Sequence, residues 1–431
     1  MFQSYDMLGI GIGPFNLSLA ALVAPTTSVR SIFFDSKPYF SWHAGLLGAG
    51  TTIQTSFLRD LVTPIDPTNK YSFVNFLVKK RRFYNFLNSD FARVLRTEFN
   101  EYLEWVSNDL ECLRFGVQVD RVEYCDGAFQ VHHGDTVVRG TNLVVGTGLQ
   151  PKVPAFAKEL LSDSVLHAQQ YLIHRPNFQS KRVVVIGGGQ SGAEIVRDVL
   201  EAKHGTASHL TWISRRTNFL PLDESAFTNE YFRPAYATYF AGLPKSTRAQ
   251  LLDEQCLASN GISNDLLTRI YQLLYQHRLC SNQGISTSLI PGVVWSGLRR
   301  RGDAYELTVS MKGTGVIESL TADVVIICTG WETKLPTCLS PLEGRILLDG
   351  DKPRIRRDFS LVWNGPEASC IYLQNGAGHD YGIADANLSV MAWRSAVIIN
   401  SIAKRAIYDT SDELAIVDWP TALETRAMAL P

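Results

Sequence analysis

Short apolar runs alternate with glycine-rich turns and with stretches of helical spacing along this chain. Residues 7–12 are apolar and predict a short buried strand, and Pro14–Val23 carries apolar side chains at helical spacing. A second apolar run, Ser31–Asp35, ends in an acid. The order strand, glycine turn, helix, strand and acid is typical of the opening of a Rossmann unit.

The same pattern recurs in the middle of the chain. Arg182–Ile186 predicts a buried strand, GGGQSG occupies residues 187–192, residues 193–200 predict a helix, and residues 210–214 predict the next strand. One glycine-rich turn is weak evidence, but two in the same structural context are strong. We therefore expect an α/β protein with two Rossmann-like dinucleotide-binding domains.

Two apolar strands that end in Thr-Gly flank the second of these units. NLVVGTG at residues 142–148 comes before the second unit, and DVVIICTGW at residues 323–331 comes after it. The glycines, Gly148 and Gly330, allow close approach of the backbone to a cofactor. The alternative is a buried strand with a tight turn after it.

These signals divide the chain into parts. We expect a first dinucleotide domain over residues 1–155, a second over 165–335, and a return to the first domain, with a C-terminal segment, over 336–431. Residues 220–290 lack a strong strand pattern and contain a helical stretch at 266–278, so we expect a smaller, mostly helical segment that covers a substrate pocket. The alternative is a helical segment that merely completes a core.

Composition narrows the function classes. The chain has 431 residues, 45% hydrophobic and 19% charged, and a formal net charge of -1, so no nucleic acid or membrane partner is expected. The basic runs at 79–82 and 299–301 are typical of solvated faces. Seven scattered cysteines without any C-x-x-C argue against a disulfide framework, a metal site and a dithiol redox centre. With no run long enough to span a membrane, we expect a cytoplasmic protein.

The first turn favours FAD. Gly9 and Gly11 allow the tight turn and the approach of a pyrophosphate, and Pro14, read as the residue in the third-glycine position, loses only an unbonded N–H in a first helical turn. Gly13, which lies between Gly11 and Pro14, is a further residue expected to contact FAD. Asp35 is expected to accept hydrogen bonds from a ribose and to repel a 2′-phosphate.

The second turn favours NADPH. Its next strand leads into Arg215 and Arg216 instead of an acid, and a guanidinium suits a 2′-phosphate. The alternative is a pair of arginines on a solvated loop. The turn residues expected to contact this dinucleotide are Gly187, Gly189, Gln190, Ser191 and Gly192.

A flavin and NADPH together imply hydride transfer, and the missing cysteine pair excludes a disulfide reductase. The remaining route is reaction of reduced flavin with O₂ to a C4a-hydroperoxyflavin that transfers an oxygen atom. The general flavin-monooxygenase fingerprint F-x-G-x-x-x-H-x-x-x-W/P is broken, since of Leu161, Asp163, His167 and Tyr171 only the histidine matches.

From residue 5 to residue 394 the chain resembles the flavin N-hydroxylating monooxygenases of hydroxamate siderophore biosynthesis, and among them the lysine and diamine enzymes. The motifs that carry the resemblance are GIGIGPFNLSLAAL, FSWHAGLL (40–47), IQTSFLRDLVTPIDPTNKYSF (53–73), GGGQSGAE, RRTNFLPLDESAFTNEYFRPAY (215–236) and YGIADANLSVMAWRS (381–395).

The resemblance implies roles for residues outside the turns. Trp42, His43 and Leu388 would lie near the flavin, and Gln54 by both flavin and substrate. Asn229 and Asn260 would lie where the amine meets the nicotinamide, so that Gln54, Asn229 and Asn260 form the expected catalytic set. Without the resemblance, Trp42 is a core residue and Asn229 a helix cap.

Arg59 departs from the family pattern, in which FLRD is typically FLKD and the lysine holds a substrate carboxylate. An arginine still suits a carboxylate, whereas it would repel the second ammonium of cadaverine or putrescine unless paired, for example with Asp60.

The expected reaction is therefore FAD-, NADPH- and O₂-dependent N-hydroxylation of the terminal amine of lysine, cadaverine or putrescine for a hydroxamate siderophore. A primary amine has a pKa near about 10.4 and must be bound neutral, which neutral amides favour over a carboxylate. The alternatives are sulfur or Baeyer–Villiger oxidation, and a flavoprotein that wastes NADPH as peroxide. The resemblance also implies a homo-oligomer, a dimer or a tetramer.

Overall fold

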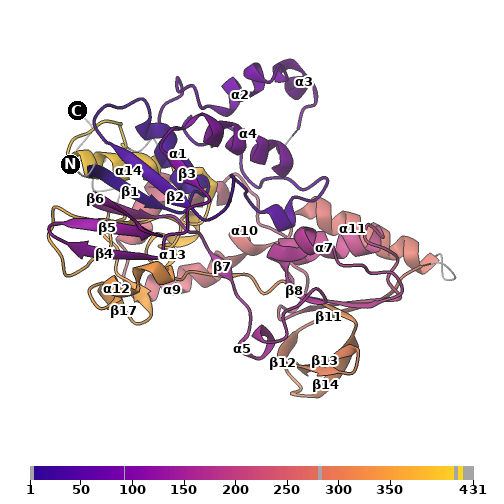
Figure 1. Ribbon diagram of the computed structural model, residues 1–431. Coiled ribbons are helices and arrows are strands. Elements are labelled where there is room, and N and C mark those ends of the chain that lie inside the picture. Colours follow the sequence, from indigo (N-terminus) through magenta and orange to yellow (C-terminus); the bar gives the residue numbers. More distant parts are fainter. Residues whose placement is uncertain (1–3, 92, 280–283, 412–415, 421–431) are drawn as a thin grey trace.

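The computed structural model describes residues 4–91, 93–279, 284–411 and 416–420, and places them in two α/β units, each built on its own sheet (Figure 1). The last part of the 336–431 prediction, residues 421–431, and Cys280 lie outside the described residues. The central strands β2 (Ser31–Asp35) and β9 (Arg182–Ile186) are nearly continuous apolar runs, as is typical of parallel strands covered on both faces.

The first sheet combines the start of the chain with a strand from its end. Its order is β3-β2-β1-β6-β5-β4, and β19 also pairs with β6; β3, β2, β1, β6 and β19 run parallel, while β5 and β4 form an antiparallel edge. α1 packs against α14 and α4. The elements are β1 (Ser4–Ile10), α1 (Pro14–Val23), β2 (Ser31–Asp35), α2 (Phe73–Lys79), α3 (Phe83–Asn88), α4 (Arg96–Asp109), β3 (Leu113–Phe115), β4 (Arg121–Cys125), β5 (Ala128–His133), β6 (Thr136–Val145), β19 (Ile371–Leu373) and α14 (Met391–Ala403).

The second sheet is parallel throughout, in the order β11-β10-β9-β15-β8. Its strands are β8 (Val165–His167), β9 (Arg182–Ile186), β10 (His209–Ser214), β11 (Ser286–Pro291) and β15 (Val324–Ile327), and α7 (Gln190–Leu200) comes after β9. Parallel sheets in this arrangement confirm the predicted α/β class with two Rossmann-type units.

Strand β11 corrects the sequence prediction for residues 220–290. It pairs in register with β10 at the edge of the second sheet, although all of its residues but the last, Pro291, fell within the segment expected to be helical. An antiparallel three-stranded sheet comes next in the chain, which the sequence did not predict. Its strands are β12 (Val293–Arg301), β13 (Ala304–Met311) and β14 (Ile317–Ala322).

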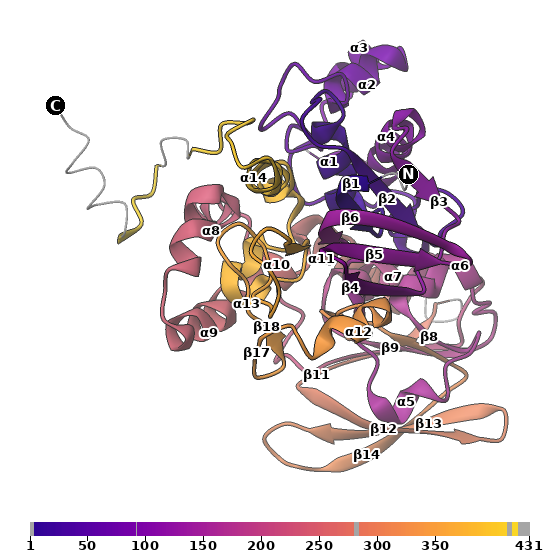
Figure 2. The same cartoon turned by 60° about the vertical axis from the view of Figure 1, so that its left-hand side comes forward.

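A run of helices fills most of the interval between β10 and β11. α8 and α9 contact α13 (Gly378–Tyr381), a part of the chain that comes after both sheets, and Figure 2 shows them side by side. α11 packs instead along α7 of the second unit. The helices are η3 (Thr228–Phe232), α8 (Pro234–Ala241), α9 (Lys245–Glu254), α10 (Cys256–Asn260) and α11 (Asn264–Leu279).

Two short strands run between the units. β7 (Gln150–Pro151) and β16 (Trp331–Glu332) pair antiparallel, so the chain leaves and re-enters the first unit along one path (Figure 1). β16 begins directly after Thr329-Gly330, and β7 begins one residue further on from Thr147-Gly148. Gly148 and Gly330 take positive φ angles of 76° and 86°.

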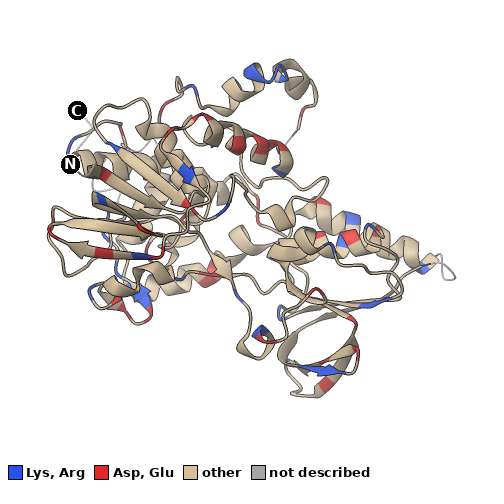
Figure 3. Ribbon diagram, in the orientation of Figure 1, with Lys and Arg blue, Asp and Glu red and all other residues tan. Residues whose placement is uncertain are grey.

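Charged residues of both signs are interspersed over the two units (Figure 3). In the basic runs, Arg82 pairs with Glu101, and Arg299 pairs with Glu306, at 2.8 and 2.7 Å. Within the described residues, no helix is both long and apolar enough to cross a membrane.

Candidate active site

The two glycine turns have the same backbone design. Gly11 N donates to Phe34 O at 2.8 Å, and Gly187 N donates to Ile213 O at 2.9 Å, so each turn is tied to the end of the neighbouring strand. Gly13 and Gly189 directly precede α1 and α7. Gly11 and Gly13 are therefore the structural counterparts of Gly187 and Gly189.

This correspondence corrects the sequence alignment of the first turn by two residues. Gly9 lies inside β1, where a Cβ would overlap the ring of Phe33, so it is a packing glycine and not part of the turn. Pro14 opens α1, as predicted, but it does not occupy the third-glycine position.

Asn16 occupies that position, three residues after Gly13 as Gly192 is three after Gly189. At Gly192 a Cβ would overlap Gly187 O, which shows the close approach of helix and turn. In the first unit the Asn16 side chain makes this approach with hydrogen bonds, donating to Gly11 O at 2.7 Å and to Ile10 O at 3.2 Å.

Both turns leave room for a diphosphate in front of a helix. A Cβ added at Gly13 would lie 3.8 Å from its nearest neighbour, Gly146 O, and one added at Gly189 would lie 3.9 Å from Asn260 O. Gln190 and Ser191, the first two residues of α7, add backbone N–H groups at the second turn. Open space before the first N–H groups of a helix fits a dinucleotide diphosphate in each unit.

Asp35 holds the first turn from the end of β2. Its carboxylate accepts the N–H of Ile12 at 2.7 Å and of Lys37 at 2.9 Å, and Lys37 Nζ lies 3.6 Å away. The predicted hydrogen bond to a ribose would use the remaining acceptor positions.

Arg215 and Arg216 come directly after β10 but differ in their surroundings. Arg216 Nη1 donates to Asn260 O at 2.8 Å and to Gly188 O at 3.3 Å, so this guanidinium ties the glycine turn to the end of α10. Arg215 is exposed. Arg216 is therefore part of the structure of the turn, and Arg215 is the better candidate of the two for the predicted contact with the 2′-phosphate.

Aromatic rings gather where the two units meet. The Trp42 and His43 rings are 4.7 Å apart between centroids, and Trp331 lies 6.0 Å from His43. Although His43 as a residue is exposed to solvent, desolvation of its ring by the surrounding protein and then the charge of Arg96 lower its pKa to about 4. His43 is therefore neutral at neutral pH.

His167 is a satisfied core histidine. Its Nε2 lies 3.2 Å from Gly330 O, and its Nδ1 accepts the N–H of Gln169. The side chain is 3% exposed, and desolvation lowers its pKa.

Polar atoms without partners lie beside the first turn, at the end of β19. Gln374 Nε2 donates to Phe15 O at 3.1 Å and to Asn16 Oδ1 at 3.2 Å. Among the described residues, Gln374 Oε1 and Asn375 Oδ1 are buried and have no hydrogen-bond partner. Buried acceptors next to a dinucleotide turn fit a polar heterocycle such as a flavin.

The predicted substrate residue Arg59 meets the segment that contains Leu388. Arg59 Nη1 donates to Ser389 Oγ at 2.9 Å, and Thr55 Oγ1, next to the exposed Gln54, is 3.0 Å from the same oxygen. Ser389 was missed by the sequence analysis, since it lies 330 residues away from Arg59. The suggested partner Asp60 is engaged elsewhere: its oxygens accept N–H groups of residues 62, 63 and 73.

The two asparagines occupy different places. Asn260 ends α10 beside the second glycine turn, where its carbonyl oxygen binds Arg216. Asn229 is exposed and lies inside η3, whose N-cap is Phe227, so Asn229 is not the helix cap. Within the described chain, no hydrogen bond joins the Asn229 side chain to Gln54 or Asn260.

Comparison with known proteins identifies the kind of enzyme. The family model described as L-lysine 6-monooxygenase/L-ornithine 5-monooxygenase matches residues 3–333. This chain belongs to that family. The L-lysine 6-monooxygenase/L-ornithine 5-monooxygenase family comprises flavin-dependent N-monooxygenases that use NADPH, so the predicted enzyme class and the cofactors FAD, NADPH and O₂ are confirmed.

Relatives within the family cover nearly the whole chain. L-lysine N6-monooxygenase of Escherichia coli is 40% identical over 97% of this chain and 99% of its own length. Putrescine N-hydroxylase of Acinetobacter baumannii is 34% identical over 97% of this chain and 94% of its own. Among solved structures, the FAD-bound cadaverine monooxygenase of Erwinia amylovora matches with a TM-score of 0.90, 30% identity, and coverage of 97% and 99%.

Proposed function

We propose that this enzyme N-hydroxylates the terminal primary amine of L-lysine, with cadaverine and putrescine as the alternative substrates, and thereby supplies a hydroxamate siderophore pathway. The observation that carries the choice of lysine is the Arg59 guanidinium held at Ser389, next to Leu388. A guanidinium at this position suits the carboxylate of an amino acid.

The residues proposed to hold the cofactors lie in and beside the two turns. Gly11, Gly13 and Asp35 would bind FAD, while Gly189 and Arg215 would bind NADPH. When bound, NADPH reduces the flavin, and the reduced flavin with O₂ supplies the oxygen atom. The protein orients these groups and excludes water from them.

The substrate amine must reach the flavin without its proton. Gln54 and Asn229 are neutral amides, and a neutral amide accepts a hydrogen bond from an amine without favouring the ammonium form as a carboxylate does. This is the role we propose for them.

Diamines remain a second candidate because a cadaverine monooxygenase has the same fold over 97% of this chain. The second ammonium of a diamine would lie near a guanidinium at Arg59, which disfavours binding. Among the described residues, nothing in the site favours oxidation of sulfur or of a ketone.

A substrate panel tests the proposal. Lysine, ornithine, cadaverine and putrescine are compared by the hydroxylamine formed for each NADPH consumed. Lysine is expected to give the highest ratio; peroxide without hydroxylamine for every amine would contradict N-hydroxylation itself.

The substitution Arg59→Ala is expected to lower kcat/KM for lysine about tenfold or more, because a charge-assisted contact to the carboxylate is lost, and to leave cadaverine turnover nearly unchanged. Arg59→Lys, which keeps the charge, should restore much of the lysine activity. Equal small losses for both substrates would show that Arg59 does not bind the carboxylate.

A further inference from the structure

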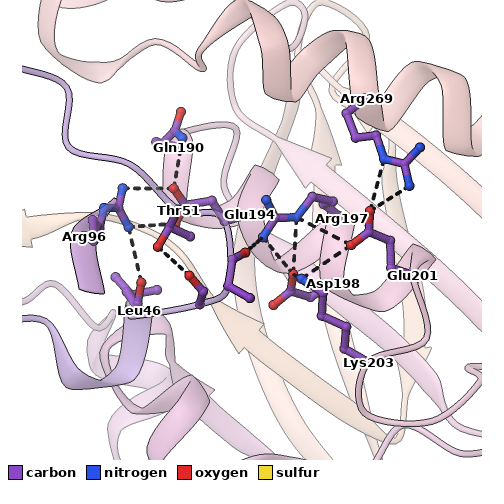
Figure 4. A network of polar contacts seen from close by, with 12 residues as sticks. Leu46, Thr51, Arg96, Gln190, Glu194, Arg197, Asp198, Glu201, Lys203 and Arg269 are labelled. Carbon is purple, nitrogen blue, oxygen red and sulfur yellow. Dashed lines mark hydrogen bonds and ion pairs between the residues drawn. The ribbon is translucent and has the colours of Figure 1, made fainter. Parts of the chain in front are cut away.

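An ion pair between Arg96 and Glu194 joins the two units. Arg96 opens α4 of the first unit, and Glu194 lies on α7 of the second. Nη1 and Nη2 of the arginine each lie 2.9 Å from one carboxylate oxygen, a forked arrangement (Figure 4). The side chains are only 13% and 6% exposed.

On the side of the first unit, the same guanidinium binds two backbone carbonyls. Nε donates to Thr52 O at 3.1 Å and Nη1 to Leu46 O at 3.4 Å. Thr52 is two residues from Gln54, and Leu46 is three residues from His43. Arg96 therefore holds both segments that contain the predicted flavin contacts.

On the side of the second unit, the carboxylate is tied to the dinucleotide turn. Gln190 Nε2 donates to Glu194 Oε1 at 2.9 Å, and Gln190 Oε1 accepts the N–H of Ser263 at 2.9 Å. Gln190 comes directly after Gly189, and Ser263 is three residues from Asn260. One continuous chain of contacts thus leads from the second turn to the flavin-side segments.

Another pair crosses from the same stretch of the first unit. Arg93 Nη2 lies 2.5 Å from an oxygen of Glu224, which is in the helical segment between β10 and β11. The stretch 93–96 itself is fixed against residues 51–53 by the antiparallel bridge between Thr52 and Leu95. A shift of the second unit would therefore pull on the segment before Gln54.

We propose that Arg96 and Glu194 are positioning residues that set the second dinucleotide turn against the flavin-side segments, and so control hydride transfer from NADPH to the flavin. Hydride transfer depends steeply on the separation of donor and acceptor, and a displacement of about 1 Å can cost on the order of a hundredfold in rate. This role extends beyond the proposed hydroxylation, because it is the same for any amine.

The test uses Glu194→Gln in the FAD-loaded enzyme. The variant keeps the size of the side chain but removes the charge that Arg96 binds. Arg269→Met is the matched control, because it breaks an ion pair within the second unit, in which Nη2 and Nε of Arg269 both donate to Glu201 Oε1, at 2.9 and 3.1 Å. Flavin reduction is monitored without O₂ or amine, once with saturating NADPH and once with dithionite.

The expected result for Glu194→Gln is a reduction by NADPH that is at least tenfold slower and a reduction by dithionite that is unchanged. Hydrogen–deuterium exchange of the backbone at 46–54 and 187–194 should become faster in both segments. The Arg269→Met enzyme should match the wild type in all three measurements.

If NADPH reduces the flavin of Glu194→Gln at the wild-type rate, the proposal is wrong. It is also wrong if the variant has only a lower melting temperature, with an unchanged rate of flavin reduction by NADPH per bound FAD. Arg96→Met is expected to behave like Glu194→Gln; if it does not retain FAD, the glutamine variant decides. Since no amine takes part in these measurements, a wrong choice of substrate for the hydroxylation does not affect their result.

Discussion

Two adjacent arginines show how far residue identity alone predicts function. Both Arg215 and Arg216 suit a 2′-phosphate by charge, and the sequence does not separate them. In the structure Arg216 binds the carbonyls of Gly188 and Asn260, which fixes the shape of the turn, while Arg215 is exposed. The difference depends on α10, which is 40 residues further along the chain than Arg216.

We predict that Arg215→Ala raises the KM for NADPH about tenfold or more and leaves the KM for NADH unchanged, because only NADPH has the phosphate. Arg216→Ala should weaken the binding of both NADPH and NADH, since it loosens the turn that each coenzyme would use. Steady-state kinetics with both coenzymes check this. Equal effects of Arg215→Ala on NADPH and NADH would refute the assignment of the phosphate to Arg215.

His43 gives a prediction for stability against pH. Its pKa in the folded protein is about 4, below the ordinary value of 6.5, so the unfolded chain binds the proton more tightly. The contribution of neutral His43 to stability is therefore complete above pH 6.5 and is lost as the pH falls toward 4. His43→Gln should show a smaller fall in melting temperature over this interval than the wild type. Parallel curves for the two proteins would show that His43 does not titrate in this way.

At the scale of elements, the sequence predicted the strands and helices around the turns closely, because buried parallel strands are unbroken apolar runs. β2 and β9 have the predicted bounds, and α1 begins and ends where expected. β11 was missed because its residues, STSLIP, have neither a long apolar run nor strict alternation. Its place in the sheet comes from pairing with β10, a contact far apart in the sequence.

The first glycine turn shows why the alignment was wrong. In GIGIG a glycine stands at every second position, so the sequence offers two alignments that differ by two residues. The choice is made by where β1 ends and by the ring of Phe33 over Gly9, neither of which is visible in the motif. The candidate site has the same limit: Ser389 joins Arg59 only through the fold.

The corrected alignment predicts opposite effects for two neighbouring substitutions. Asn16→Ala should weaken FAD binding strongly, because Gly11 O loses its Asn16 donor, and Ile10 O and the Gln374 amide each lose one of two partners. Pro14→Ala should change it little, since alanine also fits a first helical turn. The fraction of purified protein that retains FAD measures both. Loss of FAD in Pro14→Ala with retention in Asn16→Ala would instead favour the alignment that places Pro14 in the third-glycine position.

At the scale of the whole molecule, the described contacts join the units by polar pairs, by the packing of residues 44–46 against residues 168–174, and by the β7–β16 crossing, so the site between the units depends on how they are held. The expected homo-oligomer and the cytoplasmic location both stay predictions. Light scattering on the purified enzyme would measure the first of these.

The end of the described chain makes a further long-range contact. Trp419 stacks on Tyr239 with ring centroids 5.5 Å apart and lies 4.6 and 6.0 Å from the rings of Tyr236 and Tyr231. These tyrosines belong to η3, which carries Asn229, and to α8, the next helix. The described C-terminal residue Trp419 therefore covers the tyrosines of η3 and α8.

We predict that Trp419→Ala loosens η3 and α8, because each aromatic pair contributes roughly 0.5–1.5 kcal/mol beyond the area it covers. Hydrogen–deuterium exchange at residues 228–241 should become faster, and more of the NADPH consumed should appear as peroxide, since water reaches the site more easily. Trp419→Phe keeps a ring and should lie close to the wild type in both measurements. Because NADPH is proposed to bind at the second turn and not at these rings, its KM should stay the same; a raised KM with unchanged exchange would place the effect of Trp419 elsewhere.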